Sequence, residues 1–204
     1  LEHWGMTFGG QSLAMLIDSV TGIKDQMIEG PKELLRKEIT GDWIVRVGTK
    51  DFQRVKQLDK ILREELQLPL HLQLLEVERP VFVLSGEYRY QPLDKQFFET
   101  KWRKVDIFGK ARNPNSGAGG GSGDFSDMLQ WVGRWINTPV ISDLASPPDD
   151  SFTWQLHLRH PDTKQTQAED HDPQMVMANF AAQTGLKFAQ ETRPVRILFV
   201  KRDE

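Results

Sequence analysis

The feature that most constrains this chain is a helix-turn-strand pattern that occurs near both ends, at residues 13–28 and again at residues 172–200. In the second copy, Asp172 and the proline after it suit the start of a helix, and Gly185 can end that helix in the left-handed conformation. The first copy ends in the same way, at Gly22. Two helix-turn-strand segments of similar design favour a pseudo-repeated fold.

Hydrophobic periodicity over the rest of the chain predicts an alternation of short helices and strands. Apolar residues at helical spacing, which include Phe52, predict the helices, and alternation of apolar and polar residues predicts the strands. Helices are expected over residues 12–20, 51–66, 126–136 and 173–184, and strands over residues 42–47, 70–77, 81–90, 101–108, 152–158 and 195–200. The run 81–84 is apolar on both faces, which favours a strand covered on both sides. The expected fold class is α+β, with two related α/β subunits, mixed or antiparallel sheets, and short helices packed on one face.

A glycine-rich segment interrupts this pattern in the middle of the chain. Residues 113–123 consist of Asn, Pro, Ser, Ala and Gly alone, and five glycines fall within the seven residues that start at Gly117. A segment of this composition has no side chains from which to build a core, and it is typical of a flexible linker. We therefore expect one subunit over residues 1–112 and a second over residues 124–204, with 113–123 as the linker.

Composition excludes several classes of function. The chain of 204 residues has a formal net charge of −3, with basic and acidic residues interleaved, so no basic stripe is available for binding nucleic acid. No apolar run approaches the ~20 residues of a membrane-spanning helix. The absence of cysteine excludes disulfides, thiolate nucleophiles and zinc or iron–sulfur sites built on thiolates. Because the chain begins at Leu1 rather than Met, we expect it to be a mature or excised segment of a longer protein.

Short motifs spread along nearly the whole chain are similar to those of one known family. They are Ile28-Glu29-Gly30-Pro31, Gly41-Asp42-Trp43, LDKILREELQLPLHLQLLE at 58–76, RPVFVLSG at 79–86, TPVISDL at 138–144, FTWQL at 152–156 and QTGLK at 183–187 with Pro194-Val195. In this order they resemble a soil-bacterial family of unknown function. The chain has Ala145-Ser146 where that family has Thr-Gly, and Glu65-Leu66 and His71-Leu72-Gln73 at its Arg-Phe and His-Glu positions, so the chain would be a divergent member.

The resemblance implies a cellular context rather than a reaction. Members of the family are often exported domains, alone or attached to BlaR-type membrane sensor peptidases or thioredoxin-like modules. No activity or catalytic residue is established for them, and the shared motifs are apolar and turn positions that specify a fold. The resemblance therefore implies an extracytoplasmic location, in the periplasm or cell envelope.

The densest group of possible metal ligands is formed by three histidines with acidic residues nearby. They are His157, His160 and His171, and a metal-dependent or other hydrolase using this region is the alternative function. However, His157 and His160 are three residues apart at the end of an expected strand, which points them to opposite faces. The competing interpretation, a solvated loop followed by Asp172 as a helix cap, is favoured. No nucleophile-elbow or phosphate-loop motif occurs, and no cofactor is expected.

Two tryptophans are the first candidates for binding a partner. Trp131 and Trp135 are four residues apart on one expected helix, so they share a face or its edge. Such residues most often belong to the core, but Trp and Tyr also dominate the energetics of interfaces. The hypothesis that follows is a non-enzymatic interaction or sensing module of the bacterial envelope, with a protein or peptide as partner and the oligomeric state left open.

Overall fold

The computed structural model describes residues 2–46, 48–92, 102–106, 118–157 and 172–203. It has the expected α+β class, with helices and mixed or antiparallel sheets. The chain divides into two compact units, which we call unit 1 and unit 2. Unit 1 consists of Leu1–Arg79 and Arg193–Glu204, and unit 2 of Pro80–Thr192. Among the described residues, no helix combines the length and the apolar character needed to span a membrane.

Unit 1 contains a two-stranded antiparallel sheet and several helices. Its elements, in order, are β1 (Glu2–Ser12), α1 (Leu13–Thr21), a 3-10 turn (Asp25–Met27), β2 (Ile28–Glu29), α2 (Lys32–Leu35), β3 (Glu38–Val45), α3 (Asp51–Lys60) and a π-helical turn (Ile61–Glu65). Strand β1 pairs with β3. The core of unit 1 is formed by buried aliphatic residues, among them Leu16, Ile17 and Leu58.

Unit 2 contains a three-stranded mixed sheet and two longer helices. Its elements are β5 (Trp102–Asp106), β6 (Ala118–Gly123), α4 (Phe125–Trp135), β7 (Val140–Ser142), β8 (Ser151–His157) and α5 (Pro173–Thr184). The sheet order is β5-β8-β6, with β5 parallel and β6 antiparallel to β8. The core of unit 2 includes Phe82, Phe152 and Phe180, all of which are buried.

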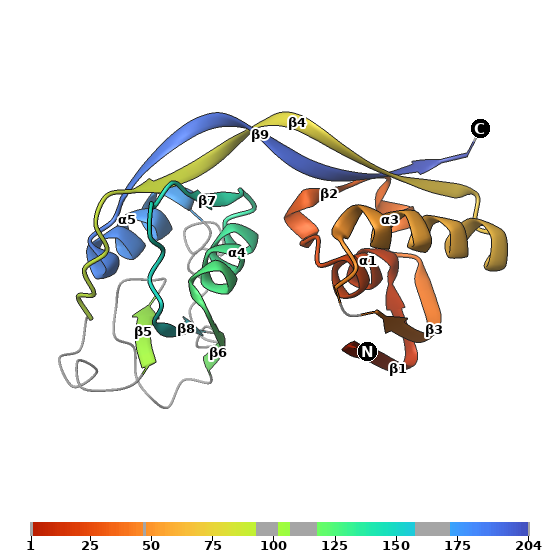
Figure 1. Ribbon diagram of the computed structural model, residues 1–204, viewed down its shortest axis with the longest axis horizontal. Helices are drawn as coiled ribbons and strands as arrows, with labels where there is room; N and C mark the ends of the chain where they lie inside the picture. Colours follow the sequence, from red (N-terminus) through yellow and green to blue (C-terminus); the bar gives the residue numbers. More distant parts are fainter. Residues whose placement is uncertain (1, 47, 93–101, 107–117, 158–171, 204) are drawn as a thin grey trace, which may run out of the picture. The chain divides into compact units, whose positions relative to one another are not determined.

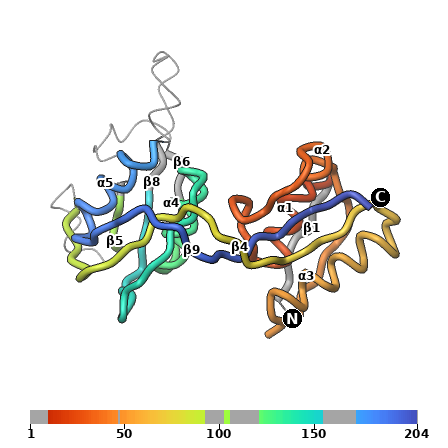
Figure 2. The backbone as a smooth tube through the Cα atoms, turned by 90° about the horizontal axis from the view of Figure 1, so that it is seen from above, coloured from red at the N-terminus to blue at the C-terminus, as the bar shows by residue number. Residues whose placement is uncertain are grey.

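Two long strands contribute residues to both units. They are β4 (Leu70–Ser85) and β9 (Lys187–Arg202), which are neighbours in a sheet of order β2-β9-β4-β7 (Figures 1 and 2). Strand β2 pairs in parallel with β9, and β7 pairs in parallel with β4. The runs expected as separate strands at 70–77 and 81–90 are therefore one strand, which ends at Ser85. Residues Val81–Leu84 are all buried, as the prediction of a covered strand requires.

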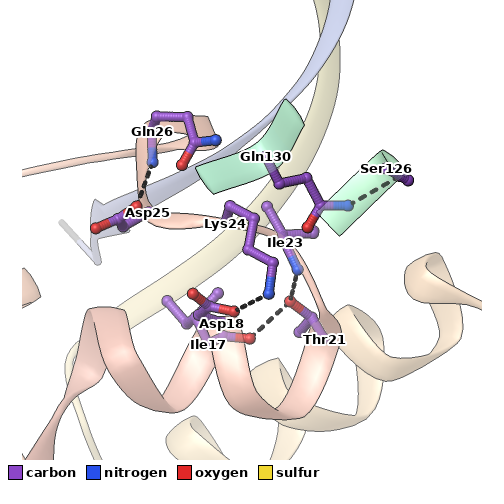
Figure 3. A network of polar contacts seen from close by, with 9 residues as sticks. All are labelled: Ile17, Asp18, Thr21, Ile23, Lys24, Asp25, Gln26, Ser126 and Gln130. Atoms are coloured by element: carbon purple, nitrogen blue, oxygen red, sulfur yellow. Dashed lines mark hydrogen bonds and ion pairs between the residues drawn. The ribbon is translucent and has the colours of Figure 1, made fainter. Parts of the chain in front are cut away.

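The end of α1 shows how the sequence specifies a turn. Ser12 caps the helix by accepting a hydrogen bond from the Met15 amide, and Gly22 ends it with φ of 79°. Figure 3 shows that the hydroxyl of the buried Thr21 donates to the Ile17 carbonyl and accepts from the Ile23 amide. Helix α5 ends in a closely similar way, at Gly185.

In α5, Asp172 accepts hydrogen bonds from the amides of Gln174 and Met175, and Gly185 ends the helix with φ of 71°. The Thr184 hydroxyl donates to the Phe180 carbonyl. Both helix ends were predicted from the sequence, and both predictions are confirmed.

Apart from the short helix α2 and the 3-10 and π-helical turns, the same order of elements occurs twice along the chain. One run is β1-α1-β2-β3-α3-β4 and the other is β6-α4-β7-β8-α5-β9. In each run the first strand pairs antiparallel with the third, while the second pairs in parallel with the last strand of the other run. This order matches α1 with α4 and α3 with α5, so residues 13–28 and 172–200, which the sequence suggested as copies of each other, hold different places in the two runs.

The division of the chain differs from the one expected at residues 113–123. The units meet instead at Arg79/Pro80 and at Thr192/Arg193, because β4 and β9 each leave one unit and enter the other. Residues 118–123 form β6, a strand paired with β8, rather than a linker, and residues 113–117 lie outside the described part. Glycine suits β6, because a Cβ on Gly121 would lie 2.6 Å from the buried Trp154 ring.

Candidate functional site

The two tryptophans predicted to bind a partner lie on α4 and pack against the core of unit 2. Trp131 and Trp135 are both partly buried. The Trp131 ring is tilted against that of Trp154, with 6.3 Å between ring centroids. These contacts favour the interpretation of both residues as part of the core, and their role in partner binding stays a prediction.

Of the three histidines, only the backbone of His157 is described, at the end of β8, and His160 and His171 lie outside the described residues. Within the described part of the chain, no group of three or more histidine and acidic residues is placed to hold a metal ion.

A groove lies among the described residues of unit 1. It lies between the end of β3 and α3, and we call it the β3 groove. Its volume is about 830 Å³, and it is open on one side. The lining residues come from α1 (Val20), from β3 and the residues after it (43–46, 48 and 49), and from α3 and the turn after it (52–54, 56–58 and 61). A cavity of this size is typical of a binding site.

The β3 groove lies beside the last three residues of β3, Trp43–Val45. Side chains of successive strand residues point to opposite faces, so a surface lined by all of residues 43–46 includes both faces and the edge between them. Among the described residues, β3 is paired only with β1. The other edge of β3 therefore presents backbone N–H and C=O groups that a further strand could pair with.

Two large apolar side chains are exposed at the groove. Ile44 on β3 is 68% exposed, and Phe52 on α3 is 57% exposed. Phe52 was predicted to belong to the buried face of its helix, but that face turns inward at Val55 and Leu58, which are buried. Phe52 lies in the first turn of the helix, where it faces the groove rather than the core. Exposed aromatic and aliphatic residues in a concave surface are typical anchors for a partner.

The charged residues that line the groove are all cationic. They are Arg46, Arg54 and Lys56, and none of the described lining residues is acidic. Arg46 and Lys56 are exposed, and neither forms an ion pair within the described part of the chain. The groove thus combines apolar anchors with a positive rim, although the net charge of the whole chain is −3.

A polar cluster in unit 2 was the other candidate for a chemical site. Arg103 on β5 forms an ion pair with Asp150 at 3.0 Å, and its guanidinium lies over the Tyr90 ring, 5.2 Å from the centroid. Burial raises the pKa of Tyr88 and the nearby Asp150 carboxylate raises it further, so Tyr88 stays protonated at neutral pH and cannot act as a base.

The same cluster holds β5 in place. The Tyr90 hydroxyl donates to the Lys104 carbonyl at 2.9 Å and accepts from the Lys104 amide at 2.8 Å. Together with the Arg103–Asp150 pair, these bonds fix both sides of β5. Their structural role accounts for the cluster without a reaction.

The chain was compared with protein-family models, with curated proteins and with solved structures, and none of them matches it. The candidate site therefore rests on its own geometry.

The sequence pattern predicted the strand and the helix that form the groove, but it did not predict the groove itself. The strand at 42–47 and the helix at 51–66 were expected. Ile44 lies on the face of that strand that carries fewer apolar residues. What was missing is the pairing of β3, because a single strand pattern does not say which of its edges has a partner. The sequence held no signal that Ile44 and Phe52 are exposed, because Phe52 is in phase with the buried Val55.

Proposed function

We propose that this protein is a non-enzymatic interaction module that binds a segment of a partner protein in the β3 groove. The observation that carries the proposal is the exposure of Ile44 and Phe52 in a groove at the end of β3, a strand that pairs only with β1 among the described residues. Edge strands bind extended segments through main-chain hydrogen bonds, and neighbouring apolar pockets give the selectivity.

Binding in the groove would bury apolar surface that is otherwise in water. Each Å² of apolar surface removed from water contributes about 25 cal/mol, so two large side chains supply several kcal/mol before the entropic cost of association. A moderate affinity, suited to a sensing or assembly role, is what such a surface supports.

The experiment is a selection of random peptides displayed on phage. Wild-type protein is the bait, and the variant with both Ile44→Asp and Phe52→Asp is used for counter-selection. Both side chains are exposed, so the variant should keep its fold, which circular dichroism checks. The control is Met15→Asp, because Met15 on α1 is 58% exposed and does not line the groove.

The proposal expects peptides that bind the wild type and the Met15 variant but not the double variant. A selection that returns no peptide able to distinguish the double variant from the wild type would contradict it.

We further propose that the module belongs to the bacterial envelope. Only the sequence resemblance to the family of exported domains supports this part. Fractionation of cells that express the complete open reading frame tests it, and recovery of the protein in the cytoplasm alone would contradict it.

A further inference from the structure

Unit 2 offers an internal template for how the β3 groove is filled. Strand β8 follows α4 and β7 and precedes α5, just as β3 follows α1 and β2 and precedes α3. Both β8 and β3 pair antiparallel with the first strand of their run, β6 or β1. The two strands thus hold the same place in the repeated order of elements.

The two strands differ at their other edge. In unit 2 that edge is covered by β5, which pairs in parallel with β8 over residues 151–155 and also packs against α5. Within the described residues of unit 1, no strand takes this place beside β3, and the β3 groove lies between β3 and α3. The strand β5 has no counterpart in the first run of elements.

The way β5 is held shows which interactions such an added strand uses. Val105 is fully buried and pairs with Trp154, so one side chain of β5 enters the core. Arg103 on β5 pairs with Asp150 of the surrounding unit. An apolar side chain that points inward and an ion pair at the rim therefore accompany the main-chain hydrogen bonds.

At the β3 groove the sign of the rim charge is reversed. In unit 2 the added strand carries the cation and the surrounding unit carries the carboxylate of Asp150. In unit 1 the surroundings carry the cations Arg46 and Lys56, and the groove has no acidic lining residue among those described. Charge complementarity then requires acidic side chains on the segment that binds.

We infer that the β3 groove binds an extended segment of a partner protein that carries apolar and acidic side chains on the same face, and that the segment adds to β3 as a parallel strand. The inference rests on the proposed function and specifies its partner. Apolar side chains of the segment contact Ile44 and Phe52, and its carboxylates lie beside Arg46 and Lys56. Ile44 and Arg46 are two residues apart and therefore share a face of the strand, so the apolar and acidic side chains of the segment lie on one face, as Val105 and Arg103 do on β5.

The test uses three synthetic peptides of equal length on the full chain. Each repeats valine, threonine, X and threonine, so that valine and X lie on one face of a strand. X is glutamate, lysine or serine in the three peptides, and their length matches the eight residues of β3. Fluorescence anisotropy with a terminal dye gives the dissociation constants. The glutamate peptide should bind at least about tenfold more tightly than the lysine peptide, with the serine peptide between them.

Charge-reversal variants show whether the preference between the peptides depends on the cations of the groove. The double variant Arg46→Glu and Lys56→Glu should bind the glutamate peptide at least about tenfold more weakly than the wild type does, and it should prefer the lysine peptide. Two further reversals, Lys32→Glu and Lys37→Glu, serve as the matched control, because both side chains are exposed in unit 1 and neither lines the groove. The control should leave the preference between the peptides unchanged.

Strand direction is tested with a nitroxide spin label at either end of the glutamate peptide. For a parallel strand, a label at the N-terminus should broaden amide signals near Glu38, and a label at the C-terminus should broaden signals near Arg46. The reverse pattern, or equal affinity for the three peptides, would overturn the inference.

The two proposals can fail separately. If phage selection returns peptides that need Ile44 and Phe52 but carry no acidic residues, the inference fails and the proposed function stands. If no peptide from either experiment depends on the groove, the proposed function fails as well. Self-association of the protein that charge reversal at Arg46 abolishes would also overturn the inference, because the groove would then bind a second copy.

Discussion

The edges of β3 and β8 differ in whether a strand covers them. Strand β8 lies between β6 and β5, and its side chains Phe152 and Trp154 are buried. Strand β3 is paired on one side only within the described residues, and Ile44 near its end is exposed. Edge strands that remain open are prone to unwanted pairing, and charged side chains are one way in which proteins limit it. The cations Arg46 and Lys56 beside the β3 edge both discourage pairing with basic segments and favour acidic ones.

The same order of elements therefore gives a strand edge that is covered in unit 2 and, within the described residues, one that is not covered in unit 1. Closure in unit 2 depends on a strand from elsewhere in the chain, β5, and on the few polar contacts that hold it. The predictions that follow test how firmly unit 2 is closed and how closely the two units resemble each other.

Phe180→Ala should have the largest effect on stability. Phe180 on α5 is fully buried in the core of unit 2, and truncation of such a residue costs about 3–5 kcal/mol. Leu58 is buried on α3, the matching helix of unit 1, and Leu58→Ala should cost about 2–5 kcal/mol there. Hydrogen exchange measured residue by residue should show each change weakening protection in its own unit first. Equal loss of protection in both units would contradict the separation of the two cores.

Gly121→Ala tests whether the glycine-rich segment is a strand. The new Cβ would meet the buried ring of Trp154, so the change should cost about 1–3 kcal/mol by overpacking. The neighbouring Ser122 is exposed, and Ser122→Ala serves as the control, expected within about 0.5 kcal/mol of the wild type. Urea unfolding followed by tryptophan fluorescence measures both. If Gly121→Ala left the free energy of unfolding unchanged, the result would favour the interpretation of this segment as a linker.

The sequence predicted local structure better than it predicted partners. The helix ends at Gly22, Asp172 and Gly185 depend on neighbouring residues, and they could be recognised because the chemistry is local. The pairing of β6, by contrast, depends on Trp154, which is more than thirty positions away, and glycine composition alone indicated a linker.

The candidate site could not be predicted from the sequence, for a related reason. A strand edge is open or closed according to where a distant segment runs, and β5 precedes β8 by a long stretch of chain. Exposure of Phe52 could not be separated from burial by periodicity, because Phe52 is in phase with the buried Val55. Prediction of the site therefore requires knowledge of tertiary contacts, which a local sequence pattern does not supply.

Tyr90→Phe tests the closure of the β8 edge. The change removes the hydroxyl that bonds both the amide and the carbonyl of Lys104, and it should cost about 1–2 kcal/mol. The β5 amides should exchange faster with solvent than in the wild type, while amides of β3 keep their rates. Unchanged exchange in β5 would mean that the Arg103–Asp150 pair and the burial of Val105 suffice to hold the strand.

The smallest expected effect compares the ends of α1 and α5. Thr184→Val removes one hydrogen bond, to the Phe180 carbonyl, and should cost about 0.5–1.5 kcal/mol. Thr21→Val removes the matching bond to Ile17 and also the acceptor of the Ile23 amide, so it should cost roughly 0.5–1 kcal/mol more. Urea unfolding of the two variants measures the difference. If Thr184→Val proved the more costly change, the second hydrogen bond at Thr21 would contribute nothing, because water would replace it at the partly exposed Ile23.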